Sequence, residues 1–202
     1  MFRRITFPLA VSVMALVVVL LGAPTHTNAQ QTSFPQYEYK LLSTNRVGTM
    51  EKEMNETAAE GYAFQEAVAG STSFGGSEVV VIMARPAGAS KPRYQYKLLA
   101  TSKTSTMQKE MQAAGEAGFT HREETVFKKT FGTEVTVVLE RDLNAPTVAY
   151  DYKLLATSKT STLQKEMSEA GAEGYEFVGV TNGDTAFGGT EVIAIMRRPR
   201  RH

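Results

Sequence analysis

Residues 37–42 read YEYKLL, residues 94–99 read YQYKLL and residues 150–155 read YDYKLL. Aromatic and alternating residues of this kind are typical of a β-strand. Each hexapeptide is followed at the same offset by a helical pattern, then by a glycine and an aromatic residue, and finally by an apolar stretch that ends in arginine. A fixed period predicts one supersecondary unit repeated in space. The sequence therefore predicts three repeats, at residues 37–86, 94–142 and 150–199.

The middle of each repeat has the periodicity of an amphipathic helix. Met50 and Met54 lie four residues apart, and the same spacing recurs in the other two repeats. Residues at this spacing share one face of a helix. Ser105, with Gln108 three residues later, predicts a capping box at the start of the second helix. Each helix is expected to end at a glycine in the left-handed conformation; these are Gly61, Gly118 and Gly174.

The last strand of each repeat decides the layout of the sheet. Residues 192–196 are apolar throughout, and a strand that is apolar on both faces is a central strand covered on both sides. A strand order of 1-3-2 places it centrally and makes every neighbour antiparallel. The turn before it in the third repeat lies either at Asn182-Gly183, a strong hairpin signal, or near Gly188-Gly189.

We therefore expect an α+β fold of three tandem β-α-β-β repeats, each a three-stranded antiparallel sheet of order 1-3-2 with one helix on a face. A unit of about 50 residues is marginally stable alone, so we expect the three repeats to cover one another. The alternative is three separate units that complete their cores by oligomerising.

The repeat resembles a known family. The pattern Y-x-Y-K-L-L, a short helix, E-G-Y and a closing apolar strand is similar to the small βαββ domain family catalogued as a domain of unknown function, whose members show Y-x-Y-K followed by E-G-W-E. Residues 60–62 and 173–176 match that second motif, whereas residues 117–119 read AGF and depart from it. The resemblance covers nearly all of residues 37–199. It implies the fold, and it implies no activity, ligand or catalytic residue.

The N-terminus has the features of a bacterial secretory signal peptide. Arg3 and Arg4 precede an apolar run at residues 7–22, and Thr27 and Ala29 suit the cleavage positions. We expect residues 1–29 to be removed, which leaves no stable membrane span and places the protein in the periplasm or outside the cell. The alternative is a retained anchor, since residues 5–23 are just long enough to span a bilayer.

Composition excludes several kinds of chemistry. The chain has no cysteine, which removes disulfides, thiolate metal sites and cysteine nucleophiles. Without Arg3 and Arg4 the chain holds 20 basic and 21 acidic residues, a net charge of −1, so no nucleic-acid partner is expected. The arginines near the C-terminus form either a solvated end or a contact with an anionic envelope surface. No cofactor and no metal are expected.

Two sets of residues are candidates for a ligand surface. One is an aromatic residue before glycine at each reversal of the chain, where it would dock a glycan or a protein unless it folds back onto the core: Phe74, Phe131 and Phe187. The other is a lysine and a threonine just ahead of a helix, where they would bind an anion or form an ordinary polar turn: Lys103, Thr104, Lys159 and Thr160.

No repeated catalytic set is evident. Glu53, Glu110 and Glu166 recur in a K-E-M triplet, which is typical of a solvated helix face. His121 stands where the other repeats have phenylalanine, as a substituted strand residue. We therefore expect an exported, non-enzymatic binding or scaffolding protein of the cell envelope, with an envelope or extracellular partner that the sequence does not identify. The alternatives are an envelope hydrolase that uses carboxylate or histidine chemistry, and a structural protein that self-assembles into a homo-oligomer through its sheet edges.

Overall fold

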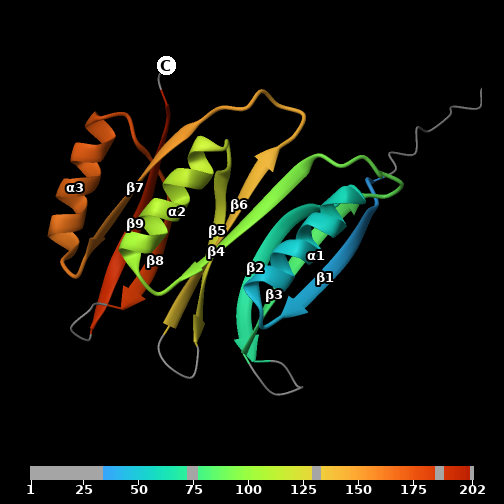
Figure 1. Cartoon of the computed structure of the whole chain (residues 1–202), viewed down its shortest axis with the longest axis horizontal. Helices are drawn as coiled ribbons and strands as arrows, with labels where there is room; N and C mark the ends of the chain where they lie inside the picture. The colour runs from blue at the N-terminus through green and yellow to red at the C-terminus, as the bar shows by residue number, and fades with distance from the viewer. Residues whose placement is uncertain (1–33, 72–76, 129–132, 185–188, 201–202) are drawn as a thin grey trace, which may run out of the picture. The chain divides into compact units, whose positions relative to one another are not determined.

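The computed structural model describes residues 34–71, 77–128, 133–184 and 189–200 (Figure 1). The first repeat contains β1 (Tyr37–Thr44), α1 (Val47–Ala59), β2 (Ala63–Ser71) and β3 (Ser77–Pro86). The second contains β4 (Tyr94–Thr101), α2 (Thr104–Glu116), β5 (Thr120–Lys128) and β6 (Thr133–Asp142). The third contains β7 (Tyr150–Thr157), α3 (Thr160–Ala172), β8 (Glu176–Asp184) and β9 (Thr190–Pro199).

The three sheets confirm the predicted fold. Their strand orders are β1-β3-β2, β4-β6-β5 and β7-β9-β8, and every pair is antiparallel. Asn182 and Gly183 lie inside β8, where they pair with Val192 and Glu191, so the hairpin turn is not at Asn182-Gly183. None of the helices among the described residues is long and apolar enough to cross a membrane.

Each helix begins directly after a short turn. The last residue of each first strand is a threonine whose hydroxyl accepts a hydrogen bond from the backbone N–H two residues later; the pairs are Thr44 with Arg46, Thr101 with Lys103 and Thr157 with Lys159. The capping box predicted at Ser105 is wrong, because α2 starts at Thr104 and its N-cap residue, Lys103, makes no capping hydrogen bond with its side chain. The predicted glycine ends are confirmed, with φ of +93°, +83° and +88° at Gly61, Gly118 and Gly174.

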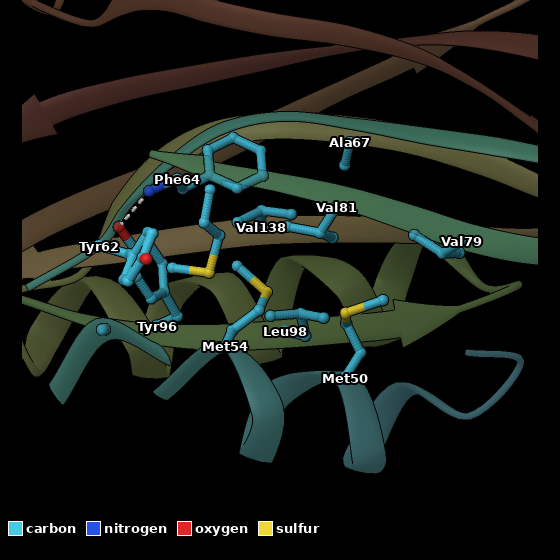
Figure 2. Close-up of a cluster of buried hydrophobic side chains, with 12 residues drawn as sticks. Met50, Met54, Tyr62, Phe64, Ala67, Val79, Val81, Tyr96, Leu98 and Val138 are labelled. Atoms are coloured by element: carbon cyan, nitrogen blue, oxygen red, sulfur yellow. Dashed lines mark hydrogen bonds between the residues drawn. The ribbon is translucent and has the colours of Figure 1, made fainter. Parts of the chain in front are cut away.

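We call the side of each sheet that carries its own helix the front face, and the opposite side the back face. In the first repeat, Val81 and Met83 of the front face pack with Met50 and Met54 of α1. The same buried cluster includes Tyr96, Leu98 and Val138, which come from the second repeat (Figure 2). The back face of the second sheet therefore completes the core of the first repeat.

The second buried cluster has the same construction. Met107 and Met111 of α2 pack on Val137 of β6, and Tyr152 and Ile195 of the third repeat join them. Neighbouring repeats thus share their cores, as the short length of each unit led us to expect. The back faces of the second and third sheets cover the front faces of the first and second repeats. Among the described residues, the back face of the first repeat and the front face of the third repeat are therefore not covered by another repeat.

Candidate functional site

The helix of one repeat binds the edge strand of the next through its side chains. The Asn55 amide of α1 donates to the carbonyl oxygen of Tyr96 and accepts from the N–H of the same residue, both at 2.9 Å. The Glu51 carboxylate accepts from the N–H of Leu98 at 2.8 Å. Strand β4 is an edge strand, so these side chains satisfy backbone groups that a neighbouring strand would otherwise pair with.

Helix α2 binds the edge strand β7 in the same way. The Gln112 side-chain oxygen accepts from the N–H of Tyr152 at 3.0 Å. Gln108 donates to the carbonyl oxygen of Tyr152 at 2.8 Å and accepts from the N–H of Leu154 at 2.7 Å. Two successive junctions between repeats therefore use the same helix positions against the same strand positions.

A tyrosine hydroxyl forms a second contact common to both junctions. The N–H of Phe64, at a β-bulge in β2, donates to the hydroxyl of Tyr96 at 2.8 Å (Figure 2). This hydroxyl donates in turn to Glu140 Oε2 at 2.9 Å. The N–H of His121, at the matching bulge in β5, donates to the hydroxyl of Tyr152 at 2.7 Å. Burial raises the pKa of Tyr96, and it raises the pKa of Tyr152 to about 12, so both phenols keep their protons at neutral pH.

A close backbone approach is the third shared element. A Cβ atom at Gly115 would lie 2.5 Å from the carbonyl oxygen of Tyr150 and 2.8 Å from the ring of Tyr152. Glycine at this helix position therefore lets β7 approach α2 more closely than a larger residue would allow. The first repeat has the small Ala58 at the same position, and it is buried.

The first junction also contains a pair of acidic side chains. The N–H of Ala67 in β2 donates to Glu123 Oε2 of β5 at 3.0 Å. The pKa of Glu123 is raised to about 7: burial is the largest cause, the hydrogen bond from Ala67 lowers the pKa, and a hydrogen bond with Glu66 raises it. The third repeat has Gly179 at the position of Glu66 and Glu123, so the second junction has no such pair. There, Glu124 lies 2.6 Å from the nearly buried His121 ring.

The first repeat leaves its back face open. Tyr39 is 63% exposed, whereas the equivalent Tyr96 and Tyr152 are 2% and 3% exposed. The alternation of the strands places three more exposed apolar side chains on the same face as Tyr39. We call this surface the first back face; it consists of Tyr37, Tyr39, Leu41 and Val68.

The third repeat leaves its front face partly open. Phe177, at the bulge of β8, is 52% exposed, whereas Phe64 at the equivalent bulge of β2 is 3% exposed beneath Tyr96. Gly171 of α3 corresponds to Gly115, and a Cβ atom there would meet nothing within 4 Å. We call this surface the third front face; it consists of Gln164, Gly171, Phe177 and Val180, and all four are exposed.

The residues predicted to bind a ligand occupy several places. Phe74, Phe131 and Phe187 lie outside the described residues. Lys103 and Lys159 are exposed at the starts of α2 and α3, and Thr160 is exposed beside Lys159. The hydroxyl of Thr104 donates to Glu191 Oε1 of β9 at 2.8 Å, so this threonine belongs to the second junction.

The three acidic residues considered for catalysis lie on three different helices. Glu53 lies on α1, Glu110 on α2 and Glu166 on α3. The described part of the chain holds no group of three or more histidine and acidic residues arranged to bind a metal ion.

The sequence interpretation missed the side chains that bind the edge strands. Asn55, Gln108 and Gln112 each follow a methionine of the apolar stripe directly, so they border the buried face of their helix. A polar amide repeated beside the stripe was the available signal. The chain matches no protein-family model, no curated protein and no solved structure.

Proposed function

We propose that this chain is an exported, non-enzymatic binding or scaffolding protein of the cell envelope, and that it binds its partner through the first back face. One observation carries the proposal. The second tyrosine of the repeated hexapeptide is buried against a preceding repeat in β4 and β7, and it is exposed in β1. Terminal repeats of repeat proteins need a polar outer face to stay soluble, whereas the first back face keeps the tyrosines and the leucine of the internal repeats.

The edge of β1 supports a binding role as well. Among the described residues, no side chain forms a hydrogen bond to the backbone of Tyr39 or Leu41. At the equivalent positions of β4 and β7, every backbone N–H donates to a helix side chain; these residues are Tyr96, Leu98, Tyr152 and Leu154. A partner would thus gain both an apolar surface and a row of backbone donors and acceptors.

Export is tested separately from binding. We expect the protein recovered from the periplasm or the medium of a producing bacterium to begin at Gln30, because the residues at the predicted cleavage site suit signal peptidase. N-terminal sequencing and the intact mass check this. Recovery of the chain only from the cytoplasm, with residues 1–29 still attached, would exclude export.

Binding is tested by photocrosslinking in the producing cells. A photoreactive benzoylphenylalanine replaces Tyr39, and in a control it replaces Lys109, which is exposed on α2. We expect light-dependent adducts at position 39 and few at position 109, with mass spectrometry identifying what is attached. Equal yields at the two positions would show that the first back face has no specific occupant.

A further inference from the structure

We infer that the occupant of the first back face is a second copy of this chain, bound through its third front face. Repeat 3 of one copy and repeat 1 of the next would then form a junction of the same kind as the two junctions inside each copy. This inference rests on the proposed function of the first back face as a binding surface, and it names the partner.

The third front face has the parts that receive a neighbouring repeat. Gln164 stands at the position of Gln108, whose single side chain binds two backbone groups of β7. Gly171 stands at the position of Gly115 and offers the same close approach, with open space in front of it. The bulge at Phe177 corresponds to the bulges whose backbone N–H groups bind Tyr96 and Tyr152.

The first back face has the parts that enter such a site. Tyr39 stands at the position of Tyr96 and Tyr152, and Leu41 stands at the position of Leu98, which is buried in the first shared core. Ala84 replaces Glu140 next to this tyrosine, so the Tyr39 hydroxyl needs another acceptor. At the second junction that acceptor is a backbone carbonyl, since the Tyr152 hydroxyl donates to Phe119 at 3.3 Å.

One substitution makes the contact between copies weaker than the internal junctions. Ser168 occupies the position of Asn55 and Gln112, and its side chain is too short to repeat their bonds to the edge strand. The internal junctions also form within one chain, whereas this contact depends on protein concentration. The pairing is heterologous, so successive copies build either a closed ring or an open chain.

The test is sedimentation velocity of the exported, processed protein over a wide concentration range. We expect the mean mass to rise with concentration. Gly171→Lys and Leu41→Lys should each weaken this association at least about tenfold, because each places a lysine in the contact. Thermal unfolding verifies that each variant is folded.

Two controls match these variants in chemistry. Ser161→Lys adds a lysine to the same helix at a position whose equivalents, Gly48 and Ser105, stay exposed at the internal junctions. Leu143→Lys replaces another exposed leucine, in the linker after β6. Both controls should associate like the unmodified protein.

Mixing the two disruptive variants tests the pairing itself. The Leu41→Lys variant keeps an intact third front face, and the Gly171→Lys variant keeps an intact first back face. Their mixture should therefore form a heterodimer that cannot extend, at concentrations where each variant alone is still monomeric.

Three results would overturn the inference: a monomer at the highest concentration, association that Gly171→Lys leaves unchanged, or association equally weakened by the controls. An adduct at position 39 that contains only a different protein would also refute self-association, while the proposed function would stand. If no specific adduct forms at position 39 and the protein is also monomeric, both the self-association and the proposed binding function are refuted.

Discussion

Strands β1 and β4 have almost the same sequence and opposite surroundings. Both begin with tyrosine and continue to Lys-Leu-Leu, and both occupy the edge of a three-stranded antiparallel sheet. Tyr96 of β4 is buried and bound by three polar groups, whereas Tyr39 of β1 is mostly exposed. The hexapeptide thus determines a strand and the faces of its side chains, and the preceding repeat determines which of those faces is buried.

The strongest test of this comparison replaces the two tyrosines with alanine. Tyr96→Ala should cost about 3–5 kcal/mol of unfolding free energy, because it leaves a cavity in the first core and removes the hydroxyl that binds Phe64 and Glu140. Tyr39→Ala should change the stability by less than about 0.5 kcal/mol. Urea unfolding at low protein concentration measures both, and similar losses would contradict the comparison.

Alanine substitutions at two equivalent helix glycines should change the stability in opposite directions. Gly115→Ala is expected to destabilise by about 1–3 kcal/mol, because the new Cβ atom would lie 2.5 Å from the carbonyl oxygen of Tyr150. Gly171→Ala has open space and should stabilise by up to about 1 kcal/mol through its better helix propensity. Thermal unfolding of the two variants checks this, and a gain at both positions would show that β7 can move away from α2.

Much of the fold could be predicted from residue patterns. Alternation gave the first strands, the methionine spacing gave the helices, and the apolar closing strand gave the central position of β3, β6 and β9. The helix starts could not be placed from Ser105, since the turn is fixed instead by the Thr101 hydroxyl and the backbone of Lys103. Such a bond is local, yet it competes with several other hydroxyls in the same segment.

The binding surfaces were much harder to predict. Nothing within the hexapeptides distinguishes exposed Tyr39 from buried Tyr152, because the difference lies in which repeat precedes each of them. Likewise, Gly115 and Gly171 both lower helix propensity, and only the approach of β7 gives Gly115 a packing role. Information about neighbours in space is absent from a local pattern.

The helix side chains that bind edge strands provide a third comparison. Asn55→Ala should cost about 1–3 kcal/mol, because it leaves both backbone groups of Tyr96 without their partner in a partly buried site. Ser168→Ala, at the equivalent exposed position of α3, should have an effect of less than about 0.5 kcal/mol. Chemical unfolding measures both changes, and a neutral Asn55→Ala would mean that water replaces the amide at no cost.

The two junctions should also differ in their response to pH. Folding raises the pKa of Glu123 from its usual 4.5 to about 7, so the folded chain holds this proton more tightly than the unfolded chain does. The resulting stabilisation is complete below about pH 4.5 and is lost as the pH rises through about 7. We expect Glu123→Gln to flatten the decline in stability between these values, and Glu110→Gln on the exposed face of α2 to leave it unchanged. Unfolding curves across this pH range measure the stability of each variant. If stability falls equally steeply with pH in the two variants, Glu123 is not the group responsible.

Sharing cores between neighbours has an evolutionary consequence. Residues 96–111 and 152–167 differ only where Met107 corresponds to Leu163, as expected after a duplication. Every unit has a back face that can pack on the preceding repeat and a front face that can pack on the following one. A gene that gains another copy of the repeat therefore encodes a longer protein that uses the same contacts. The length of such a protein can then change by whole units, because each unit contacts only its neighbours.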